Sequence, residues 1–110
     1  MALTETVIDE AYTKLAKTRL EHWQASERLS LRRMELAKAR ADKVHVGLID
    51  GKNEAEREAK ARHYLNEEFT EVELADLEEK RMAIAVEMCR IEIERIQTVL
   101  RYLGLPPKTN

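Results

Sequence analysis

Hydrophobic residues recur along the first half of the chain with the spacing of an amphipathic helix. No proline or glycine interrupts the segment from Glu5 to about Val46. At about 100° per residue, a set of apolar side chains falls on one side of this segment, as expected of a helix that packs along its length. The set contains Ile8, Tyr12, Leu15, Ala16, Trp23, Met34, Ala37, Ala41, Val44 and Leu48. The pattern predicts a first helix over residues 5–46, with Thr4 as its N-cap.

The second half contains two apolar stripes on one predicted helix. The first alternates at spacings of three and four, as in a helix packed lengthwise on another with coiled-coil geometry. This predicted seam contains Met82, Val86, Cys89, Ile93, Ile96, Leu100 and Leu103. The second stripe lies on the other side and contains Leu77, Ile84, Met88, Ile91 and Val99. So broad an apolar surface needs cover from more than one direction, and a two-helix hairpin supplies only one neighbour.

A change of pattern at Gly47 separates the two halves. Asp50-Gly51 is a turn dipeptide, and Asn53 with Glu56 three residues later forms a capping-box pattern. We therefore expect the chain to reverse over residues 47–52 and a second helix to begin at about residue 53. Lys52 and Asn53 at a helix N-terminus would also suit an anion. The glycine and lysine spacing of a phosphate-binding loop is missing, so a corner is the favoured interpretation.

The second helix is predicted over residues 53–103. Gly104 suits the left-handed position after a helix, and Pro106-Pro107 forbids continuation, which leaves residues 104–110 as a tail. A capping-type pattern at Thr70 leaves open a break near residues 66–70, which would separate a short linker helix from a longer one. The predicted fold class is all-α, a long antiparallel helical hairpin that forms a single domain over residues 1–110.

The second apolar stripe predicts assembly. Two hairpins joined through it would form a four-helix bundle, and a homo-oligomer, in particular a dimer, is the favoured state. A foreign protein partner stays open, because a self-complementary stripe and one that receives another helix have the same sequence pattern.

Composition and charge support long helices. Charged residues make up 36% of the chain, with three glycines and two prolines, which is typical of exposed helices rather than of a sheet. The segment from Lys14 to Lys43 contains nine basic and four acidic residues, whereas the segment from Glu54 to Glu94 contains thirteen acidic and six basic residues. Pairing between the two halves is the favoured explanation. The alternative is nucleic-acid binding along one flank of the first helix, by Lys14, Lys17, Arg28, Arg32 and Lys43.

The residue types favour no enzyme, metal or cofactor. Cys89 lies within the apolar seam, where a thiol behaves as a small buried hydrophobe. No apolar run approaches the roughly 20 residues that span a bilayer, so we expect a cytoplasmic protein without a membrane partner. Two groups of side chains lack the motif of a metal site, namely His22, His45 and His63, and Glu67, Glu68, Glu71 and Glu78.

One short motif carries a resemblance to known proteins. Gly51-Lys52-Asn53 followed by Glu56-Arg57, between a basic first helix and an acidic second helix, resembles small uncharacterised helical proteins of bacteriophages and prophages. The resemblance covers most of the chain, implies a phage context and a host cytoplasm, and assigns no catalytic residue.

We therefore expect a non-enzymatic helical protein that self-associates and acts by binding a macromolecular partner. Phage context leaves two alternatives. One is a DNA recombination or maintenance accessory, and the other is an anti-defence binder of a host protein or nucleotide signal.

Overall fold

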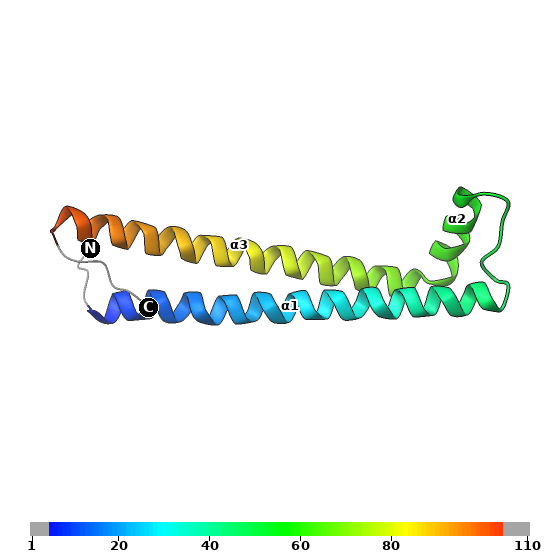
Figure 1. Cartoon of the computed structure of the whole chain (residues 1–110), viewed down its shortest axis with the longest axis horizontal. Coiled ribbons are helices and arrows are strands. Elements are labelled where there is room, and N and C mark those ends of the chain that lie inside the picture. Colours follow the sequence, from blue (N-terminus) through cyan, green and yellow to red (C-terminus); the bar gives the residue numbers. More distant parts are fainter. Residues whose placement is uncertain (1–4, 105–110) are drawn as a thin grey trace. The chain divides into compact units, whose positions relative to one another are not determined.

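The computed structural model describes residues 5–104 and contains three helices and no strand within that range. Helix α1 spans Glu5–His45, α2 spans Glu54–Tyr64 and α3 spans Asn66–Tyr102 (Figure 1). The expectations for Thr4 and for Pro106-Pro107 fall outside the described residues. Because α1 packs against α3 as a hairpin, the predicted all-α class and helical hairpin are confirmed.

The chain divides into two compact units, each of which combines a segment of α1 with a segment of α3 that runs in the opposite direction (Figure 1). The terminal unit contains, within the described range, residues 5–24 and 80–104. The turn unit contains residues 25–79 and therefore all of α2.

The core of the terminal unit lies where Leu15 of α1 meets Cys89 and Ile93 of α3. Ile96 and Leu100, further along α3, are also buried. Three partly buried side chains pack against the cluster, namely Ala11, Tyr12 and Val86. The four buried residues of α3 follow the alternating three and four spacing predicted for the first stripe, so that part of the stripe forms the packed face.

Three hydrogen bonds involve side chains of the same seam. The amide Nε2 of Gln97 donates to the Tyr12 hydroxyl at 2.9 Å. The Thr18 hydroxyl donates to the carbonyl oxygen of Lys14 at 2.7 Å and accepts the thiol of Cys89 at 3.7 Å. These side chains are hydrogen-bonded where they are buried, so their desolvation is compensated.

The core of the turn unit forms around the break between α2 and α3. Ile49 of the turn, Ala61 of α2 and Leu65 are buried together. Leu65 has φ −117° and ψ 29°, which ends α2, and its N–H donates to the Ala61 carbonyl at 2.9 Å. The break thus comes one residue before the expected range 66–70. Leu36, Ala39 and Phe69 pack against this cluster.

Thr70 does not cap a helix, contrary to the capping-type pattern. Its hydroxyl donates to the carbonyl oxygen of Asn66 at 2.8 Å, one turn earlier in α3. This is the bond that a threonine makes inside a helix, so the sequence pattern located the break but assigned it to the wrong residue.

Opposite charges pair between the basic part of α1 and the acidic segment within the turn unit. The pairs are Arg40–Glu58 at 2.9 Å, Arg32–Glu71 at 3.4 Å and Arg33–Asp76 at 3.8 Å. Such partly exposed pairs contribute about 0–1 kcal/mol each. Their positions follow the charge complementarity between the two halves of the sequence.

The apolar stripe predicted for α1 is correct only near its start. Leu15 is buried, but Trp23 and Met34 are 59% and 69% exposed, and Val44 and Leu48 are exposed as well. The buried and half-buried positions instead recur by three and four: Leu15, Thr18, His22, Ala25, Leu29, Arg32, Leu36, Ala39 and Lys43. The predicted stripe assumed 3.6 residues per turn, whereas the seam that packs on α3 repeats every 3.5 residues. The two directions therefore separate by about 20° per heptad. Over the 41 residues of α1 this error accumulates to about a third of a turn.

Candidate interaction surface

The turn between α1 and α2 begins with a glycine-dependent helix stop. Gly47 has φ +83°, a left-handed conformation that glycine adopts without strain. Its N–H donates to the Val44 carbonyl at 3.1 Å, and the N–H of Leu48 donates to the Lys43 carbonyl at 3.0 Å. This is the Schellman pattern, which satisfies the last carbonyl groups of α1.

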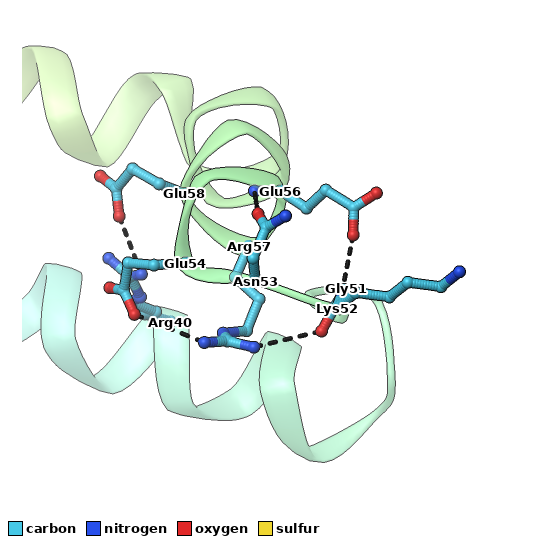
Figure 2. Close-up of polar contacts among 8 residues, drawn as sticks. All are labelled: Arg40, Gly51, Lys52, Asn53, Glu54, Glu56, Arg57 and Glu58. Carbon is cyan, nitrogen blue, oxygen red and sulfur yellow. Dashed lines mark hydrogen bonds and ion pairs between the residues drawn. The ribbon is translucent and has the colours of Figure 1, made fainter.

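Asn53 caps α2 with the help of Glu56 (Figure 2). The side-chain oxygen of Asn53 accepts the N–H of Glu56 at 2.9 Å. The Glu56 carboxylate accepts the N–H of Lys52 at 2.7 Å, whereas a standard capping box would use the N–H of Asn53. The predicted cap is therefore present, with its return bond shifted by one residue.

Two further side chains hold the turn closed. Arg57 donates to the carbonyl oxygen of Gly51 at 3.1 Å and pairs with Glu54 at 3.4 Å (Figure 2). Lys60 forms a salt bridge with Asp50. The hydrogen bond from Lys60, reinforced by its charge, lowers the pKa of the Asp50 carboxyl, and the hydrogen bond to Asp50 raises the pKa of Lys60.

This geometry gives Lys52 and Asn53 structural roles in the turn. The chain's own Glu56 carboxylate lies at the start of α2, where a bound anion would otherwise accept backbone N–H groups. The Lys52 side chain extends away from the turn (Figure 2). Anion binding by these two residues stays a prediction.

The packed stripe of α3 ends earlier than the sequence pattern indicates. Cys89, Ile93, Ile96 and Leu100 are buried, and two further members, Met82 and Val86, are half-buried. Leu103 is 58% exposed, so its assignment to the packed stripe is wrong. Helix α3 ends at Tyr102, so Leu103 lies just beyond its last residue. Gly104, with φ +75°, terminates the helix as predicted.

The second stripe of α3 is exposed in the described chain. In the terminal unit, Ile84, Met88 and Ile91 are 65%, 61% and 50% exposed. We call these three residues the outer stripe. Leu77, in the turn unit, is exposed too. Branched and long apolar side chains on successive turns form the kind of contiguous patch that marks an interaction site.

A groove of about 490 Å³ lies between α1 and α3 in the terminal unit, next to the outer stripe. Ala11, Lys14 and the buried Thr18 line it from α1. Ala85, Met88, Cys89 and Glu92 line it from α3. The sequence reading missed this groove, although Lys14 and Glu92 each directly precede a buried seam residue, which is the signal that could have located it.

The five basic residues proposed for nucleic-acid binding do not share one environment. Lys14, Lys17 and Arg28 are exposed. Arg32 pairs with Glu35 at 3.0 Å and also with Glu71, and Lys43 is half-buried at a seam position. The expectation that all five lie along one flank of the first helix is therefore wrong for Arg32 and Lys43, because both occupy positions of the packed seam.

Within residues 5–104, no three His, Cys, Asp or Glu side chains gather in a group that could hold a metal ion. Nor does this part of the chain contain a helix with the length and apolar character needed to cross a membrane. The thiol of Cys89 is buried beside Thr18. The distinctive surface feature is the outer stripe with its adjacent groove.

These features define a protein of the all-α class, a helical hairpin with an exposed apolar stripe on α3. Comparison with known proteins finds no family model, no curated protein and no solved structure that matches the chain. The phage resemblance of the turn motif stays a prediction.

Proposed function

We propose that the protein is a non-enzymatic helical interaction protein that self-associates through the outer surface of α3. The observation that supports this proposal is that α3 carries two apolar stripes on different sides. One apolar stripe packs on α1, and the outer stripe of Ile84, Met88 and Ile91 is at least 50% exposed. Burial of apolar area contributes about 25 cal/mol per Å², so an assembly that covers this stripe is favoured over an isolated chain.

In the proposed assembly two hairpins form a four-helix bundle, with a dimer as the favoured state. The charged surfaces of such a bundle then act by binding a macromolecular partner in the cytoplasm, which is the host cytoplasm if the chain is encoded by a phage. The catalytic machinery of an enzyme has no part in this role.

The experiment that tests self-association is size-exclusion chromatography with light scattering on the full chain, over a range of concentrations. We expect a discrete oligomer that dissociates on dilution. A monomer at every concentration up to about 100 μM, well above the affinity of ordinary specific complexes, contradicts the proposal.

A matched pair of variants locates the interface. Ile91 and Leu31 are both 50% exposed, on α3 and α1 respectively. Ile91→Glu is expected to weaken association because it places a charge in the interface, whereas Leu31→Glu leaves association unchanged. Equal effects of the two substitutions would remove α3 as the associating surface.

DNA binding stays the alternative, supported by the exposure of Lys14, Lys17 and Arg28. Its test is a gel shift with double- and single-stranded DNA at two salt concentrations. Binding that weakens steeply with salt supports a phosphate-contacting role, and the absence of any shift at low salt removes it.

A further inference from the structure

The groove of the terminal unit carries opposite charges on its two helices. Lys14 immediately precedes the buried Leu15 of α1, and Glu92 immediately precedes the buried Ile93 of α3. Both therefore occupy the position that flanks a coiled-coil seam, on the same face of the hairpin. Cys89 contacts Thr18 and Gln97 contacts Tyr12, and this antiparallel alignment places Lys14 and Glu92 at about the same height along the two helices.

We propose that this face receives a second copy of the chain about a two-fold axis parallel to the helices, so that Lys14 of each copy pairs with Glu92 of the other. The inference rests on the proposed self-association and specifies its geometry. Each copy completes the groove of the other.

The charges select this axis among the two-fold arrangements that bring the groove faces together. Rotation about an axis parallel to the helices leaves every residue at its height along the helices. It also places the partner's α1 over α3 and the partner's α3 over α1. Lys14 then meets the partner's Glu92 twice. An axis across the helices and through the groove sets Lys14 against the partner's Lys14 and Glu92 against the partner's Glu92. Like charges in an interface disfavour that arrangement.

The apolar residues of the face agree with the same axis. Met88 lines the groove and is mostly exposed, so the Met88 side chains of both copies can enter the shared space. One heptad before Lys14 stands Val7, and one heptad after Glu92 stands Val99. The parallel axis brings these two valines of opposite copies together, two helical turns or about 10 Å from the charge pair.

Glu92 already pairs with Arg95 one turn along α3, at 2.9 Å. The carboxylate has two oxygens and can accept from both partners, so this contact orients Glu92 without saturating it. Its side chain is 45% exposed, which leaves it accessible to a partner's lysine.

The test mixes two charge-reversal variants, Lys14→Glu and Glu92→Lys. Alone, each places like charges against each other twice in its own dimer and is expected to weaken association by about tenfold or more. In the mixed dimer both introduced charges face each other, as do the remaining native Lys14 and Glu92. A one-to-one mixture is therefore expected to recover association close to that of the native chain.

Control substitutions carry the same charge changes at exposed positions off the groove. Arg19→Glu on α1 and Glu94→Lys on α3 are expected to leave association unchanged and to show no recovery on mixing. Circular dichroism verifies that all four variants keep native helicity. Repulsion inside one chain cannot be relieved by mixing, so recovery reports a contact between copies.

A second measurement uses the native protein and does not depend on how the variants fold. A zero-length carbodiimide cross-linker is applied to an equal mixture of ¹⁴N- and ¹⁵N-labelled chains. We expect Lys14–Glu92 cross-linked peptides that join one light and one heavy partner. Cross-links at this pair that are only all-light or all-heavy, or none at all, overturn the proposed geometry.

The outcomes separate the two proposals. A native chain that is monomeric in light scattering removes self-association and this geometry together. A native oligomer whose variants associate as tightly as native protein, or do not recover on mixing, removes the Lys14–Glu92 contact and leaves self-association standing.

Discussion

The thiol of Cys89 on α3 donates to the hydroxyl of Thr18 on α1, with the two heavy atoms 3.7 Å apart across the seam of the terminal unit. Both side chains are buried, and Thr18 in turn donates to the Lys14 carbonyl. The contact places a polar pair inside a mainly apolar seam.

This burial predicts a slowly reacting thiol. Cys89 lines the groove but is only 8% exposed, so native protein should react with a thiol-specific dye more slowly than protein in urea. The rate of dye release measures the difference. Equal rates in native and unfolded protein would contradict the buried position.

Ile96→Asp is expected to unfold the protein or to lower its stability by about 3 kcal/mol or more, because it places an unpaired charge in a dry seam. Ile96 is only 2% exposed. Thermal melts followed by circular dichroism measure the loss. Ile84→Asp, on the outer stripe, serves as the control and should keep native helicity while weakening association.

Gly51→Ala is expected to destabilise the turn more than Gly47→Ala. A Cβ on Gly51 would lie 2.7 Å from the Glu56 Cβ, whereas a Cβ on Gly47 meets nothing within 4 Å. Both glycines have positive φ, so Gly47→Ala costs about 1 kcal/mol from backbone strain and Gly51→Ala costs more. Urea titration of the two variants compares them, and a larger loss for Gly47→Ala would argue against the turn geometry.

Asn53→Ala is expected to cost about 1 kcal/mol because it removes the side-chain cap of α2. Lys52→Ala should leave stability nearly unchanged, since the turn uses the backbone N–H of Lys52 rather than its ammonium group. Thermal unfolding of both variants provides the comparison. If Lys52→Ala abolished binding of a partner or nucleotide at unchanged stability, the turn would be a binding site as well as a corner.

Asp50→Asn is expected to remove a small, pH-dependent stabilisation. Lys60 lowers the pKa of Asp50 below its ordinary 3.8, so the native pair stabilises the fold above that pH and is lost as the pH falls below it. The raised pKa of Lys60 keeps the pair charged up to at least its ordinary 10.5. The melting-temperature difference between native and variant protein should be constant from pH 5 to 9 and shrink at acidic pH. A difference that persists at pH 2 would assign the effect to another contact.

Local signals predicted the helix ends well. Gly47, Asn53 and Gly104 act through their own backbone or short side chains, so their neighbours in sequence are sufficient to identify them. The packed face of α3 was also readable, because Ile93, Ile96 and Leu100 are large and apolar.

The packed face of α1 was not readable in the same way. Its seam contains Thr18, His22 and Ala25, whose polarity or small size gives a weak hydrophobic pattern, while the larger Trp23 is exposed. Which of the two possible stripes of α1 is buried depends on how α3 packs against it. The groove between Lys14 and Glu92 depends on how two segments far apart in sequence align, and the positions of these two residues beside the seam indicate its place only once that alignment is known.

The core around Leu65 has a consequence for helix alignment. Seams that repeat every seven residues can slide past each other by one repeat and meet similar partners again. In the turn unit such a slip would pull Ala61 and Leu65 out of their shared core with Ile49. Packing of the short helix α2 therefore fixes one alignment of the α1 and α3 segments within the turn unit.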